Sequence, residues 1–157
     1  MSALLSEFEN FPRERDLIGQ MLMTYGELEF ALLGNLREAL DADINTTTKI
    51  LFRVRGEASR LAVADAILRP AFTEHGLKSQ WITAYAAVRH WKNIRNQYAH
   101  CHWQTEFGQL FFMNLDEDAE APDEINVLFV PIDLALLTRQ HFYFETRLHV
   151  YTFSEIK

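Results

Sequence analysis

The chain has 157 residues, of which 48% are hydrophobic and 24% are charged, and its net charge is −7. This composition excludes wholesale disorder and a low-complexity or collagen-like protein, and the length fits one domain over residues 1–157. The single cysteine, Cys101, excludes a disulfide framework and a cysteine-rich zinc site. Because no run approaches the ~18 apolar residues of a membrane span and residues 1–11 lack an apolar signal core, we expect a cytoplasmic protein.

Charge is divided unevenly along the sequence. Residues 1–43 carry a net −6, residues 44–105 carry +6 and residues 106–157 carry −7. No Asp or Glu occurs between His75 and Thr105. One interpretation is that basic central helices pair with acidic outer helices, and the other is a basic groove for an anionic ligand.

Apolar residues at helical spacing predict three helices, over residues 13–41, from a cap at Thr46 or Thr47 to about Phe72, and over residues 78–100. The first helix carries Glu29 within its apolar stripe. The dipeptide Arg69-Pro70 is expected to end or kink the second helix, because proline lacks a backbone N–H. Four amphipathic helices, counting a last one at the C-terminal end, favour a helical bundle.

The hydrophobic period changes after His100. We expect two strands in residues 102–115 that turn near Gly108, an acidic loop at 116–124, a third strand at 125–130 and a last helix from Pro131-Ile132-Asp133 to about Phe153. The predicted fold is therefore mainly α. It is a four-helix up-and-down bundle with a small antiparallel β insertion, at about residues 102–130, before the last helix.

The most informative motif closes the third predicted helix, as Arg95-Asn96-x-x-x-His100. It resembles the R-x(4–6)-H signature of the HEPN superfamily, whose members are small helical-bundle domains. The resemblance implies a metal-independent endoribonuclease that works in a homodimer and needs no cofactor. RNA or a nucleotide, and an antitoxin protein, are the implied partners, whereas DNA and membranes are not expected.

The three motif residues suit RNA cleavage. Histidine titrates near neutral pH, which suits His100 to general acid–base work on the 2′-hydroxyl and the leaving oxygen. Arg95 offers a planar set of donors to phosphate, and Asn96 is suited to orient the phosphate or His100. Further candidate binding residues are Arg89, Lys92, Asn93, Glu29 and His102.

Helix geometry favours a site shared by two subunits. Arg95 and His100 are five residues apart, which separates them by about 140° on a straight helix. They meet at one ligand only if the helix unwinds near His100 or if a second subunit supplies the other half. We therefore expect residues 78–100 to line the interface of a symmetric dimer.

Two other interpretations stay open. In one, the domain is a catalytically silent module that binds a nucleotide, an RNA or a protein. In the other, it is a structural dimer in which Arg95 is buried and paired with Glu29, because a charge on an apolar stripe needs a partner. One departure from related toxins is His102, which stands where they carry a tyrosine. No metal site is expected among the histidines and Cys101.

Overall fold

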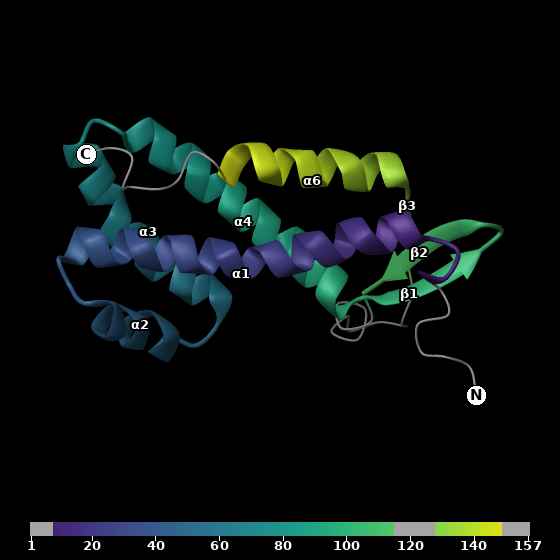
Figure 1. Cartoon of the computed structure of the whole chain (residues 1–157), viewed down its shortest axis with the longest axis horizontal. Coiled ribbons are helices and arrows are strands. Elements are labelled where there is room, and N and C mark those ends of the chain that lie inside the picture. The colour runs from purple at the N-terminus through teal and green to yellow at the C-terminus, as the bar shows by residue number, and fades with distance from the viewer. Residues whose placement is uncertain (1–7, 115–127, 149–157) are drawn as a thin grey trace. The chain divides into compact units, whose positions relative to one another are not determined.

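A computed structural model describes residues 8–114 and 128–148 of the chain (Figure 1). It is mainly helical, with a small three-stranded antiparallel sheet before the last helix, which confirms the predicted fold class. The elements are α1 (Pro12–Leu40), α2 (Ile44–Arg53), α3 (Glu57–Glu74), α4 (Lys78–His100), β1 (His102–Glu106), β2 (Gln109–Met113), β3 (Val130–Ile132) and α6 (Leu134–Leu148). The predicted acidic loop, strand residues 125–127 and helix residues 149–153 lie outside the described residues.

The chain divides into two compact units. Among the described residues, the first unit takes 8–24, 93–114 and 128–143, and the second takes 25–92 and 144–148. Helices α1, α4 and α6 each contribute residues to both units, so neither unit is one continuous stretch of sequence. That all 157 residues form a single domain stays a prediction.

Four helices supply the core of the second unit. Its buried cluster is made of Leu33, Leu36, Leu51, Ala64, Leu68, Phe72 and Trp81. The rings of Phe72 and Trp81 stack with centroids 5.0 Å apart, and Trp81 Nε1 donates a hydrogen bond of 2.8 Å to Asp65 Oδ1. The second half of α1, α2, α3 and the start of α4 are therefore held together by apolar burial, with this hydrogen bond joining α3 to α4.

The second predicted helix is in fact two helices, α2 and α3. Gly56 lies between them and has φ +81°, a backbone conformation that residues with a Cβ rarely adopt. The cap is Asp43 rather than Thr46 or Thr47, and its Oδ1 accepts from the backbone N–H of Asn45 and of Thr46. The apolar spacing continues across the break, which is why periodicity alone joined the two helices.

Pro70 does not end its helix, because α3 continues to Glu74. The proline removes one backbone donor, which leaves the carbonyl of Ala66 without its usual partner. Ala66 and Pro70 are both exposed, so water can bond that carbonyl. An exposed proline in the second-last turn is therefore tolerated here.

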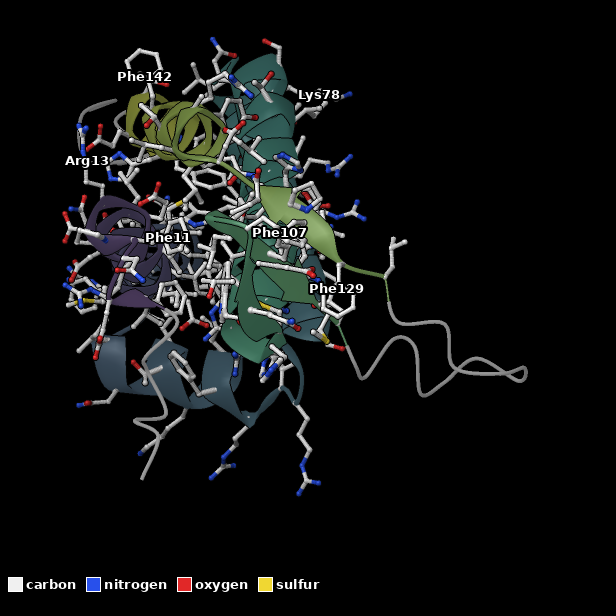
Figure 2. All side chains as sticks on the ribbon, turned by 90° about the vertical axis from the view of Figure 1, so that its right-hand side faces the viewer. Phe11, Arg13, Lys78, Phe107, Phe129 and Phe142 are labelled. Carbon is white, nitrogen blue, oxygen red and sulfur yellow. The ribbon has the colours of Figure 1, made fainter. Side chains whose placement is uncertain are left out.

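The sheet belongs to the first unit and has the order β1-β2-β3, antiparallel throughout. A two-residue loop joins β1 to β2, and both of its residues, Phe107 and Gly108, have positive φ, at +49° and +76°. Positive φ at both central positions is the mark of a type I′ hairpin turn. The predicted turn near Gly108 is confirmed, and Figure 2 views the hairpin from the side of this tip.

The third strand lies later than predicted, at Val130–Ile132, and it includes Pro131. Proline was expected to open the last helix, but β3 is an edge strand, where a missing N–H costs no ladder bond. Helix α6 instead begins at Leu134, and Asp133 caps it by accepting from the N–H of Leu136 at 2.6 Å. The β insertion and the last helix therefore meet at Asp133.

Candidate functional site

The motif residues lie at the end of α4, in the first unit. The helix is continuous to His100, and the N–H of Cys101 still bonds the carbonyl of Gln97 at 3.0 Å. The helix therefore does not unwind near His100. Within one chain, Arg95 and His100 leave the helix about 140° apart, as a 3.6-residue repeat requires.

Arg95 is hydrogen-bonded to its neighbour in the sequence. Its Nη1 donates to Asn96 Oδ1 over 2.8 Å, and both residues are half-buried. This bond uses the oxygen of the Asn96 amide as its acceptor. The remaining polar group of that side chain is the amide nitrogen, which is a hydrogen-bond donor, as the guanidinium nitrogens are. Together the two side chains form a donor-rich pair, the chemistry that phosphate oxygens bind. We had expected Asn96 to orient His100 or phosphate, and this direct bond was not predicted.

His100, Asn93 and His102 are all exposed in this unit. Asn93, Asn96 and His100 are spaced three and four residues apart, so they share one face of α4. The acid-free stretch from His75 to Thr105 contains this face, and therefore no carboxylate of that stretch opposes an anionic ligand. Of the three motif residues, His100 is therefore exposed, and Arg95 and Asn96 are half-buried.

Two neighbouring groups are kept neutral. Burial raises the pKa of the Cys101 thiol to about 12, and its Sγ lies 3.5 Å from the carbonyl oxygen of Tyr98. Burial also raises the pKa of the Tyr98 hydroxyl to about 12, and this hydroxyl donates a hydrogen bond of 2.7 Å to Gln140 Oε1. At neutral pH neither group is an anion, so Cys101 is not an activated nucleophile.

Arg89 and Lys92 belong to the second unit, and each is described there by itself. Arg89 is exposed, with its guanidinium carbon 5.9 Å from the centroid of the Tyr85 ring, a cation–π contact. Lys92 is half-buried. Their joint use with the motif residues stays a prediction.

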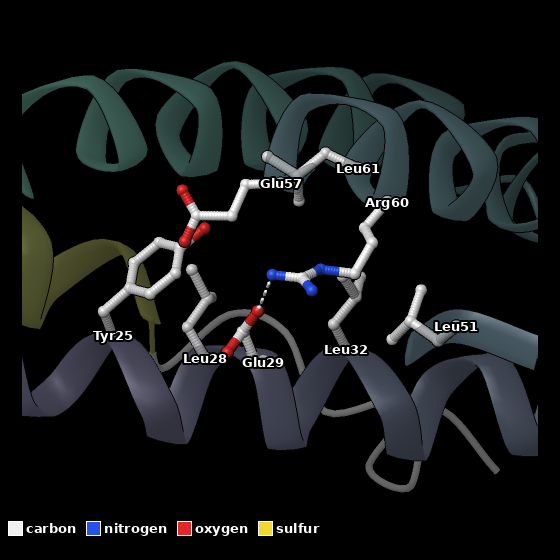
Figure 3. Close-up of a pocket in the computed structure, with 8 residues that line it drawn as sticks. All are labelled: Tyr25, Leu28, Glu29, Leu32, Leu51, Glu57, Arg60 and Leu61. Atoms are coloured by element: carbon white, nitrogen blue, oxygen red, sulfur yellow. Dashed lines mark hydrogen bonds and ion pairs between the residues drawn. The ribbon is translucent and has the colours of Figure 1, made fainter. Parts of the chain in front are cut away.

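Glu29 pairs with a different arginine from the one expected. Its Oε1 lies 3.3 Å from Nη2 of Arg60 on α3, and the Glu29 side chain is 30% exposed (Figure 3). Glu29 therefore has a charged partner within its own unit, as Arg95 has a polar partner in Asn96, and both residues are half-buried rather than fully buried. The sequence indicates that Glu29 lies on the apolar stripe of its helix. It does not indicate which helix carries the arginine that pairs with Glu29.

The Glu29–Arg60 pair lies in a small hollow of the second unit (Figure 3). Its apolar lining comes from Leu28, Leu32, Leu51 and Leu61, and Tyr25 and Glu57 complete it. Arg60 and Glu57 were missed from the sequence. Their signal was the three-residue spacing that places both on one side of α3.

The described residues, 8–114 and 128–148, contain no group of three or more His, Cys, Asp or Glu side chains placed to hold a metal ion. Within the same residues, no helix is long and apolar enough to cross a membrane. Comparison of the chain with protein-family models, with curated proteins and with solved structures found no match.

Proposed function

We propose that the protein is a metal-independent endoribonuclease of the HEPN type, with Arg95, Asn96 and His100 as its site. The observation that supports this most is the Arg95–Asn96 bond of 2.8 Å beside an exposed His100, in a stretch of sequence without acids. The proposal joins that geometry to the motif resemblance.

The chemistry assigns one role to each group. A base takes the proton of the ribose 2′-hydroxyl, whose oxygen attacks the adjacent phosphorus. The bond from phosphorus to the 5′-oxygen breaks, and an acid protonates that leaving oxygen, which gives a 2′,3′-cyclic phosphate and a 5′-hydroxyl. His100 is the proton carrier, and the donors of Arg95 and Asn96 bind the charged phosphoryl oxygens.

Two copies complete this site in the proposal. One imidazole cannot be base and acid at the same moment, and Arg95 and His100 point about 140° apart on a continuous helix. A second copy brings a second imidazole and a guanidinium to the same phosphate. The helix end is therefore proposed to line a cleft between two copies.

The test is cleavage of a single-stranded RNA by the purified full chain in the presence of EDTA. We expect cleavage that survives EDTA and no cleavage of DNA of the same sequence, because DNA lacks the 2′-hydroxyl. His100→Ala should lower the rate by about a hundredfold or more, the usual contribution of a proton carrier. His90→Ala, which removes another exposed histidine of α4, is the matched control and should cleave as the wild type does.

A binding module without catalysis is the second candidate. It is favoured by the half-buried state of Arg95 and Asn96, since a bond between half-buried neighbours also serves a purely structural role. In that case the wild type binds RNA in a salt-dependent manner but leaves it intact. Intact RNA, or an undiminished rate for a folded His100→Ala protein, would exclude the nuclease.

A further inference from the structure

One face of α1 in the second unit is exposed although it carries a large aromatic side chain. The face consists of Glu27, Phe30, Gly34 and Arg37, spaced three, four and three residues apart, and we call it the α1 face. All four residues are exposed, and Phe30 is 70% exposed. This spacing is that of a coiled-coil seam, on which one helix packs along another.

The centre of the α1 face contains an exposed phenylalanine, Phe30, next to a glycine with empty space above it, Gly34. Phe30 projects from the helix, and one turn later a Cβ built at Gly34 meets nothing within 4 Å. Glycine inside a helix is less stable than alanine, and no neighbour in the described part of the chain requires its small size here. An aromatic ring from outside would fill this position without a clash.

The charges of the α1 face are complementary to those of a reversed copy. Glu27 lies at one end and Arg37 at the other, and Arg37 otherwise contacts the carboxylate of Glu38 at 3.4 Å in an exposed pair. Exposed pairs of this kind contribute little, so the guanidinium can exchange its partner. The midpoint between Glu27 and Arg37 is position 32, and this is also the midpoint between Phe30 and Gly34.

We infer that the α1 face binds the same face of a second copy, with the two helices antiparallel about a two-fold axis near position 32. Phe30 then lies over Gly34 of the partner subunit, and Glu27 lies opposite Arg37 of the partner subunit. One axis satisfies both contacts twice, as an isologous interface requires. Antiparallel seams pack in such layers, and glycine allows the helices to approach closely.

This pairing does not depend on the proposed nuclease activity. It is measured by association rather than cleavage, and none of its residues belongs to the motif. Four residues per copy make an interface well below the standard ~800 Å² per partner, so the dimer should be weak. Sedimentation velocity of the full chain from about 10 µM to about 1 mM should show a rising sedimentation coefficient, because that range spans weak dissociation constants.

Charge exchange tests the register. Glu27→Arg places two cations opposite one another and Arg37→Glu places two anions opposite one another, so each should weaken association by about tenfold or more. The double variant should associate as the wild type does. An equimolar mixture of the two single variants should also associate, because each supplies the charge that the other lacks.

Shape tests the centre of the face. Gly34→Leu fills the open position and should abolish the association that depends on the α1 face, so that only a pairing through the end of α4 remains, while the stronger helix former leaves the chain folded. Ala66→Leu, which adds a leucine to an exposed position of α3, is the control for added surface hydrophobicity and should associate as the wild type does. A wild type that stays monomeric up to about 1 mM, the weak limit of specific binding, would overturn the inference. Failure of the mixed variants to associate, or undiminished association of Gly34→Leu, would do the same.

Discussion

Two buried tryptophans of the second unit differ in how their indole nitrogens are satisfied. Trp81 is 5% exposed, stacks on Phe72 and donates from Nε1 to Asp65 Oδ1 over 2.8 Å. Trp91 is 2% exposed and stacks on Phe144 with centroids 4.6 Å apart. Among the described residues, no acceptor lies within hydrogen-bonding reach of Trp91 Nε1. The two residues therefore form a natural comparison for the value of one buried hydrogen bond.

We expect Trp81→Phe to reduce the free energy of unfolding by about 1 kcal/mol more than Trp91→Phe does, because only Trp81 loses a bonded donor. Both changes shrink the ring by the same amount, so the difference isolates the bond. Asp65 keeps its contact of 2.6 Å with Arg69 in the variant, which limits the loss. Urea unfolding of the two variants measures the difference, and equal losses would contradict the assigned bond.

The thiol of Cys101 should react slowly with iodoacetamide. Burial raises its pKa from 9.0 to about 12, so at pH 8 the folded protein holds about a thousandfold less thiolate than the unfolded chain. The rate is read by mass spectrometry with and without urea. A native rate within about tenfold of the unfolded rate would show that the thiol is not held protonated.

At the residue scale, sequence reasoning found which residues lie near helix ends but not which atoms they meet. The sequence predicted the motif residues at the end of a helix, and α4 does end at His100. The partner of Glu29 was not predicted, because Arg60 reaches it through the packing of α3 on α1. Such contacts between helices depend on packing geometry, which a periodicity of 3.6 residues does not encode.

Among the elements, α2 is a helix of ten residues that is capped at its start by Asp43. Asp43 accepts from two backbone N–H groups and from the Thr46 hydroxyl, and these bonds lower the pKa of its carboxyl below the ordinary 3.8. A lowered pKa means that this stabilisation is present above about pH 4 and is lost as the pH falls through the lowered value.

We therefore expect Asp43→Ala to lower the melting temperature at pH 7, because two orphan backbone donors at the start of α2 lose their acceptor. Asp43→Asn should lower it much less, since an amide oxygen can still accept. The difference between wild type and Asp43→Asn should shrink as the pH falls below 3.8. Thermal unfolding by circular dichroism at pH 7 and pH 3 measures both, and a gap that persists in acid would count against the cap.

The hairpin turn carries a residue that its geometry disfavours. Phe107 has φ +49°, a left-handed backbone conformation that is unfavourable for a residue with a Cβ. Its ring is 99% exposed, so packing of the side chain does not offset this cost. Phe107→Asn should raise the free energy of unfolding by about 1 kcal/mol, because Asn-Gly suits a type I′ turn. Phe107→Ala removes the same exposed ring but keeps an unsuited residue, and it should change stability little. Urea unfolding of both variants decides, and a destabilised Phe107→Asn protein would contradict this geometry.

At the element scale, the long helices were predictable and the short breaks were not. The predicted helices at 13–41 and 78–100 match α1 and α4 to within one residue, because each keeps an apolar stripe over six or more turns. The break at Gly56 was not predicted, because Leu51 and Leu61 keep the helical spacing on either side of it. The late start of β3 escaped because a proline within an edge strand looks like the start of a helix.

At the scale of the whole molecule, the two compact units are each built from separate stretches of the chain. Helix α1 passes from the first unit to the second after residue 24, α4 passes back after residue 92, and α6 passes to the second unit again after residue 143. Each of these helices is continuous across the boundary. Because helix formation is cooperative along the chain, melting of one unit should withdraw helical support from the other.

We therefore expect the full chain to unfold in a single transition, which also tests the prediction of one domain. Trp103 lies in the first unit, where it contacts the rings of Tyr98 and Phe112, whereas Trp81 and Trp91 lie in the second. Replacing Trp81 and Trp91 by phenylalanine leaves Trp103 as the only tryptophan, and Trp103→Phe leaves the other two. Within each variant, the urea transition followed by tryptophan fluorescence should coincide with the transition followed by far-ultraviolet circular dichroism. A fluorescence midpoint that departs from the dichroism midpoint in either variant would mean that the units unfold separately, despite the three helices that they share.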